Sequence, residues 1–242
     1  MIASFTAPAE DFEEFGKRFT HFADAFPAGK APAAADPYRP SLAGWTADLA
    51  KRQEAFKTAA QIQYVALVGN YRATGHVYTG ALKVLRKILS DEYLWVNVRV
   101  MGGAYGCMCS FGRSGGGTMV SYRDPNLGGT LAVYRGIPEY LRNLELSERD
   151  MTNYVIGTIG ELDHPMSPPH KGALSFQAYM EHVSVEMRQQ ERDEVLATDL
   201  ETIHSLAEYM EAIVACNQLC VVGNAGRIEE EKELFDNICV LG

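Results

Sequence analysis

The chain has 242 residues, of which 47% are hydrophobic, and a formal net charge of -9. This size and apolar content are sufficient for a large core, and the scattered Lys and Arg residues form no basic stripe of the kind that binds nucleic acid. No run of about 18 apolar residues is present, and the first residues lack the basic, apolar and cleavage-site order of an export signal. The sequence therefore predicts a soluble, unexported globular protein with no nucleic-acid or membrane partner.

The N-terminal quarter predicts a strand, an amphipathic helix, a loop and a second short helix. Residues 2–6 alternate weakly between apolar and polar side chains, as in a strand. Phenylalanine then recurs at helical spacing, which is typical of a helix face packed on a sheet: Phe12, Phe15, Phe19, Phe22 and Phe26. Residues 27–40 are rich in Ala and Pro and predict a long loop. Residues 44–55 are expected to form the second helix.

The middle of the chain predicts a strand, a long helix and a β-hairpin. Residues 61–68 have the β-branched content of a buried strand, which stops at the turn pair Gly69 and Asn70. A helix follows Tyr78 and continues over residues 93–98. Its expected core face consists of Ala81, Val84, Leu85, Ile88 and Leu89. Residues 104–111 and 118–123 are expected to pair as a hairpin around a Gly-rich tip.

The second half predicts mainly helices. Residues 127–144 and 147–162 are expected helices, the second with Ser147 and Asp150 at the spacing of a capping box. Residues 164–169 predict a loop, residues 175–187 and 193–216 two helices, and residues 219–222 a short strand before a helix from Ile228. This order favours an α/β (α+β) two-layer sandwich. Its mostly antiparallel sheet has five or six strands, helices cover one face, and residues 1–242 form a single domain.

The cysteines and histidines do not predict a metal site. Five cysteines, an odd number, favour reduced thiols in a reducing compartment and structural roles: Cys107, Cys109, Cys216, Cys220 and Cys239. Zinc hydrolysis needs two His residues four apart on a helix with a Glu beside one of them, and none of the six His residues has that spacing. Glu201 and His204 share a helix face, but one pair is at most half a site. We therefore expect no metal bound by this chain.

The segment from Arg99 to Tyr105 has the residues for binding a peptide carbonyl. An apolar helix ends at Arg99, Gly102 and Gly103 turn the chain, and a strand begins with Tyr105. The guanidinium and the phenol both donate hydrogen bonds to an oxygen on which negative charge develops. Glycines permit a close backbone approach and a positive φ. The structural alternative is an Arg that interacts with the helix dipole and a Tyr in the core.

Several segments resemble the C-terminal domain of presequence proteases, a branch of the pitrilysin and insulinase superfamily of zinc metallopeptidases. The resemblance is strongest over residues 61–145. The matching segments are residues 93–95, 98–99, 102–106, 121–126 and 168–172.

The resemblance implies a clamshell enzyme of two halves in which the zinc motif lies in the N-terminal half, outside this chain. Arg99 would hold and polarise the substrate carbonyl, Tyr105 would stabilise the oxyanion, and Gly102 and Gly103 would shape the substrate-binding turn between them. The implied activity is that of a zinc metalloendopeptidase that degrades unstructured peptides, as part of the full-length protein. The implied partners are those peptides and the N-terminal half of the same polypeptide, and the isolated fragment is expected to be inactive.

An alternative is a non-catalytic binding or scaffolding subunit of the same superfamily, because its members include inactive partners. An HxxEH motif in the parent sequence would distinguish the peptidase from such a subunit. The expected location is the cytoplasm of a bacterium, or an organellar matrix if the parent is eukaryotic.

Overall fold

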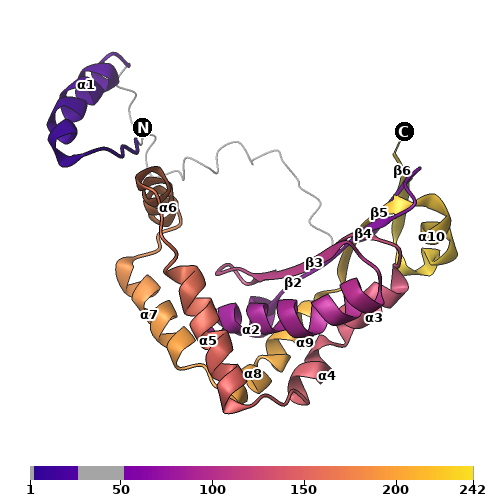
Figure 1. Ribbon diagram of the computed structural model, residues 1–242. Coiled ribbons are helices and arrows are strands. Elements are labelled where there is room, and N and C mark those ends of the chain that lie inside the picture. Colours follow the sequence, from indigo (N-terminus) through magenta and orange to yellow (C-terminus); the bar gives the residue numbers. More distant parts are fainter. Residues whose placement is uncertain (1–2, 27–51, 242) are drawn as a thin grey trace. The chain divides into compact units, whose positions relative to one another are not determined.

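The computed structural model describes residues 3–26 and 52–241 (Figure 1). Its contacts divide the chain into two compact units: residues 1–50 with 164–185, and residues 51–163 with 186–242. A single domain over residues 1–242 stays a prediction. Within the described ranges, no helix combines the length and the apolar character needed to cross a membrane.

The first unit contains the phenylalanine-rich helix. It comprises η1 (Ala9–Asp11), α1 (Phe12–Asp24) and α6 (Pro168–Met180). The expected helix is therefore confirmed, but no residue of α1 is buried. The rings of Phe5 and Phe15 stack with centroids 3.8 Å apart, so the stripe packs partly on the preceding segment. The strand expected at residues 2–6 is wrong for residues 3–6, and the loop expected at 27–40 lies outside the described residues.

The second unit is built on a six-stranded sheet. Its strands are β1 (Gln53–Thr58), β2 (Gln63–Asn70), β3 (Gly106–Phe111), β4 (Gly116–Asp124), β5 (Gln218–Asn224) and β6 (Asn237–Val240), in the order β3-β4-β2-β5-β1-β6. The pairs β3–β4, β4–β2 and β2–β5 are antiparallel, whereas β1 is parallel to both β5 and β6. The expected fold class, the hairpin and the strand before Asn70 are confirmed.

Two strands, β1 and β6, do not follow from the sequence patterns. Residues 53–55 begin β1, so the helix expected over residues 44–55 is wrong at its end, and residues 44–51 lie outside the described chain. Only Ala55 of β1 is buried, and β6 has no buried residue. These strands lack the alternation that identifies a half-buried strand.

Helices cover one face of the sheet, as Figure 1 shows for α2 (Ala81–Ile88), α3 (Gly128–Arg135) and α9 (Ala207–Cys216). Strand burial alternates accordingly: Val65 and Leu67 of β2 and Met119 of β4 are fully buried. The predicted core face of α2 is also fully buried. The helices of this unit are α2 (Ala81–Ile88), η3 (Leu89–Met101), α3 (Gly128–Arg135), α4 (Ile137–Arg142), α5 (Glu148–Leu162), α7 (Val185–Leu196), α8 (Leu200–Ser205), α9 (Ala207–Cys216) and α10 (Ala225–Glu230), with short 3-10 turns at η2 (Tyr71–Thr74) and η4 (Lys232–Leu234).

Several helix boundaries differ from the expected ones. The helix expected over residues 127–144 is divided at Gly136, and the one over 193–216 is divided into the end of α7, α8 and α9. The loop expected at 164–169 ends earlier, because Pro168 and Pro169 occupy the first turn of α6, where no backbone N–H donor is needed. The cap at Ser147 is confirmed: its Oγ accepts a hydrogen bond from the Asp150 amide at 3.1 Å.

The tip of the β3–β4 hairpin is anchored to α7. Arg113 at the tip forms an ion pair with Glu191, and the Tyr78 hydroxyl donates to the same carboxylate at 2.7 Å. Burial and this hydrogen bond raise the pKa of Tyr78. Glu191 therefore fixes the hairpin against the helical layer through partners from two other segments.

A close approach between β2 and α9 gives a stability prediction. A Cβ atom at Gly69 would lie 2.1 Å from the backbone oxygen of Ile213, whereas one at Gly116, opposite Asn70, would meet nothing within 4 Å. Gly69→Ala should therefore reduce the free energy of unfolding by about 2–3 kcal/mol, because the clash is with backbone. Gly116→Ala should leave it nearly unchanged. Urea unfolding of both variants tests this, and equal losses would contradict the packing described.

Candidate functional site

The chain reverses at two glycines between the end of η3 and the start of β3. The amide of Gly103 donates to the Arg99 carbonyl at 2.9 Å and that of Ala104 to the Val98 carbonyl at 3.1 Å, which closes the helix end. Gly103 has φ +80, a left-handed conformation that favours glycine. The predicted turn is therefore confirmed in position and in its need for glycine.

This reversal brings Arg99 and Tyr105 together. Arg99 Nη1 donates to the backbone oxygen of Tyr105 at 2.8 Å, and the guanidinium carbon lies 4.2 Å from the centre of the Trp95 ring and 5.8 Å from that of Tyr105. The Tyr105 side chain is 58% exposed, so the alternative of a Tyr in the core is wrong. One contact engages only part of the guanidinium, which has five N–H donors.

The helix that carries Arg99 is a π-helix, which the sequence reading did not anticipate. The buried residues of η3 are Leu89, Leu94 and Val98, separated by five and four positions. A π-helix forms hydrogen bonds from i to i+5 and occurs frequently at functional sites. The five-residue spacing between the apolar residues Leu89 and Leu94 is the feature of the sequence that could have indicated a π-helix. With this winding, Trp95 lies beneath the Arg99 guanidinium.

Two further residues surround Tyr105 from the end of β4. The Arg123 guanidinium lies 5.5 Å from the centre of the Tyr105 ring, and the Tyr122 ring meets it edge to face at 5.7 Å. Within the described chain, neither Arg99 nor Arg123 forms an ion pair with a carboxylate. The roles of Trp95, Tyr122 and Arg123 were missed, although all three lie in segments that carry the family resemblance.

The described residues do not provide a zinc site. They contain no group of three or more His, Cys, Asp or Glu side chains placed to hold a metal. The Nε2 atom of His204 lies 2.8 Å from the backbone oxygen of Leu144, within hydrogen-bonding distance. Zinc chemistry does not fit the side chains of this part of the chain.

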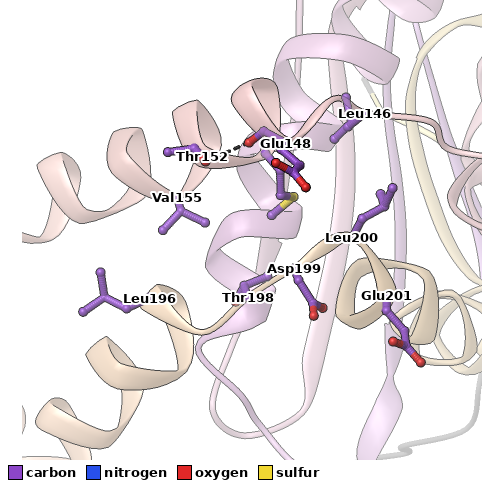
Figure 2. Close-up of a pocket in the computed structure, with 10 residues that line it drawn as sticks. Leu146, Glu148, Thr152, Val155, Leu196, Thr198, Asp199, Leu200 and Glu201 are labelled. Carbon is purple, nitrogen blue, oxygen red and sulfur yellow. Dashed lines mark hydrogen bonds between the residues drawn. The ribbon is translucent and has the colours of Figure 1, made fainter.

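A separate pocket of about 610 Å³ lies between the start of α5 and the segment that joins α7 to α8 (Figure 2). Its lining combines apolar side chains with Glu148, Asp199 and Glu201 and contains no Lys or Arg. Asp199 caps α8: its carboxylate accepts hydrogen bonds from Thr202 Oγ1 at 2.6 Å and from the Thr202 backbone amide at 2.8 Å, and these bonds lower the pKa of the Asp199 carboxyl. A lining of this charge does not suit an anionic ligand. The residues of this pocket do not include Arg99 or Tyr105.

The Cys107 thiol gives a test of where the Arg99 charge lies. Burial raises the pKa of Cys107 to about 11, and the Arg99 charge opposes this rise. Arg99→Ala should therefore raise the pKa of this thiol further, because a thiolate loses a nearby cation. The measurement is the pH profile of Cys107 alkylation by iodoacetamide, followed by mass spectrometry. Arg149→Ala, which removes an exposed cation from α5, should leave the profile unchanged, and an unshifted profile in Arg99→Ala would contradict the placement of the guanidinium.

Comparison with known proteins identifies the family. A family model described as the PreP C-terminal domain matches residues 53–225. Protein HypA of Clostridium perfringens is 44% identical over 191 residues, which cover 79% of this chain and 20% of the relative. Presequence protease 1, chloroplastic/mitochondrial, of Arabidopsis thaliana is 34% identical over 213 residues, which cover 88% of this chain and 19% of the relative. The chain thus spans about a fifth of the length of these relatives.

The fold comparison agrees with the sequence comparison. A crystal structure of a protease from Helicobacter pylori superimposes with a TM-score of 0.62 at 15% identity, over 89% of this chain and 52% of that chain. The expected resemblance to presequence proteases of the pitrilysin and insulinase superfamily is confirmed. Because the matched region covers more than half of its residues, the chain belongs to the PreP C-terminal domain family of peptidases.

Proposed function

We propose that this chain is the substrate-binding C-terminal domain of a zinc-dependent endopeptidase that degrades unstructured peptides. The observation that carries the proposal is the contact between Arg99 and the Tyr105 backbone, which holds a guanidinium and an exposed phenol on one turn. Both groups donate hydrogen bonds. Among the described residues, no carboxylate pairs with the Arg99 guanidinium or accepts a hydrogen bond from the Tyr105 hydroxyl.

Arg99 and Tyr105 would act on the scissile peptide bond through its carbonyl oxygen. The Arg99 N–H groups that do not contact Tyr105 would hold and polarise the carbonyl. The Tyr105 hydroxyl, which makes no hydrogen bond to a described residue, would donate to the oxygen as negative charge develops. Gly102 and Gly103 would let the substrate backbone approach the turn closely.

The zinc ion and the general base would be supplied from outside this chain. The described residues contain no zinc site, and the relatives are about five times longer than the matched region. We place both groups in an N-terminal half of the same polypeptide, and we expect this domain alone to be inactive.

The proposed substrates are unstructured peptides, including targeting peptides, as the name of the Arabidopsis relative suggests. An enclosed chamber admits a flexible chain that can be held extended and excludes a folded one. The proposed location is the cytoplasm of a bacterium or, for a eukaryotic parent, an organellar matrix. The similarity to a protein from a bacterium and to one named chloroplastic/mitochondrial supports this proposal.

Loss of the Arg99 guanidinium should impair turnover. In the full-length enzyme, Arg99→Ala should lower kcat for an unstructured peptide by roughly a hundredfold, the effect of removing one donor to an oxyanion. Arg149→Ala, on the exposed side of α5, serves as the matched control and should retain wild-type turnover. Unchanged cleavage by Arg99→Ala would remove this residue from the mechanism.

Loss of the Tyr105 hydroxyl should affect catalysis with little effect on the fold. Tyr105→Phe keeps the ring beside Arg99 and Tyr122 but removes the donor, so kcat should fall by about tenfold to a hundredfold while the melting temperature stays the same. Tyr64→Phe removes another exposed hydroxyl, on β2, and should have no effect on turnover. Wild-type kinetics in Tyr105→Phe would assign the phenol to packing alone.

Mixing the domain with a separately made N-terminal half distinguishes the enzyme from a non-catalytic subunit. Cleavage that appears only in the mixture, and that a zinc chelator abolishes, supports the proposal. Peptide binding without cleavage in the mixture would favour the binding or scaffolding alternative.

A further inference from the structure

The loop that follows β4 lies against the Gly102–Gly103 turn. The Asn126 side-chain amide donates from Nδ2 to the Gly102 carbonyl at 2.5 Å, and the Tyr105 amide donates to the Arg123 carbonyl at 3.2 Å. A Cβ atom at Gly103 would lie 3.5 Å from Pro125 Cγ. Two positions of the loop, Pro125 and Asn126, and Arg123 at the end of β4 therefore border the turn that separates Arg99 from Tyr105.

The loop is itself held in place from the core. Asp124 is fully buried. Its carboxylate accepts hydrogen bonds from the backbone amide of Asn126 at 2.8 Å and from Thr130 Oγ1 at 2.7 Å. Arg123 has φ +48, a conformation that a non-glycine residue retains only where its surroundings impose it. The backbone that carries the Asn126 side chain is thus fixed before that side chain reaches the turn.

The Gly102 carbonyl needs such a donor. It lies just past the last residue of η3, where carbonyl groups lack partners within the helix. Asn126 supplies a side-chain N–H, and no other donor to this oxygen is found within the described chain. Without that amide, the Gly102 carbonyl would have no donor within the described chain, and the turn would keep the hydrogen bonds made by its own N–H groups, by the Tyr105 amide and by Arg99 Nη1.

We infer that Asn126 is a positioning residue for the Arg99–Tyr105 site, an inference that rests on the proposed function. By holding the Gly102 carbonyl, its amide fixes the turn and thereby the orientation of the Arg99 guanidinium toward the substrate oxygen. Asn126 touches no reacting atom in this scheme. Its effect on rate comes from geometry, since a misplacement of about 1 Å in a catalytic group is costly to turnover.

Amide hydrogen exchange in the 242-residue chain tests the structural half of the inference. Asn126→Asp keeps the size of the side chain but replaces its N–H donor by a carboxylate oxygen that repels the Gly102 carbonyl, so the Gly103 and Ala104 amides should exchange about tenfold faster by NMR. The Gly136 amide, which donates to the Ala132 carbonyl at 3.0 Å, serves as a remote control and should be unchanged. Asn126→Gln, which restores an amide donor, should recover part of the protection. Unchanged exchange at Gly103 and Ala104 in Asn126→Asp would overturn the inference.

Kinetics of the full-length enzyme test the catalytic half. Asn126→Asp should lower kcat by about tenfold and leave KM within about twofold, because the substrate-binding groups remain present but are less well oriented. In an Arg99→Ala background the same substitution should have little further effect, because Asn126 acts through Arg99. A general structural role would lower turnover by the same factor in both backgrounds.

The outcomes separate this inference from the proposed function. Wild-type turnover in Arg99→Ala removes Arg99 from the proposed mechanism and overturns this inference with it, whereas a full-length protein that cleaves no unstructured peptide overturns the proposed function itself. Impaired turnover in Arg99→Ala overturns the inference alone if Asn126→Asp is fully active or if the two substitutions are additive.

Discussion

The chain reversal at Gly102 and Gly103 is the constraint on which the candidate site depends. It closes the end of η3 through the Gly103 and Ala104 amides and starts the edge strand β3 one residue after Tyr105. A helix end and a strand start are each defined by backbone hydrogen bonds, so the backbone positions of Arg99 and Tyr105 at this junction are fixed relative to each other. Arg99 and Tyr105 are therefore placed by main-chain geometry more than by contacts between their own side chains.

The surroundings of Arg99 keep its charge available. A salt bridge would neutralise the guanidinium and lower its attraction for a carbonyl oxygen, whereas an aromatic face and a backbone oxygen orient it without cancelling its charge. Within the described chain, the partners of the Arg99 guanidinium are the Trp95 ring, the Tyr105 ring and the Tyr105 carbonyl. Arg123 places a second cation beside the Tyr105 ring.

Sequence reasoning predicted the elements with strong periodicity or turn chemistry. The α2 core face, the β3–β4 hairpin and the Ser147 cap follow from local patterns that the structure confirms. It failed at β1 and β6, which carry almost no buried side chains, and at Gly136, where one apolar pattern spans two helices. The segment from Arg99 to Tyr105, with its glycine pair, was recognisable as a candidate site because its residues are close in sequence. The positions of Tyr122, Arg123 and Asn126 beside this segment were not recognisable from the sequence. They depend on the β3–β4 register, which places the end of β4 next to the Gly102–Gly103 turn.

The position of β1 has a consequence for how the sheet assembles. Both neighbours of β1 come from the far end of the chain, with Gln53 opposite Leu219 and Ala55 opposite Ile238. Loop-closure entropy opposes such distant pairing, so β1 joins the sheet only after nearly all of the domain has been synthesised. Until then β2 has no neighbour on its β5 side, and its unpaired backbone groups are open to pairing with another chain. A partial chain that lacks β5 would therefore present an open sheet edge at β2.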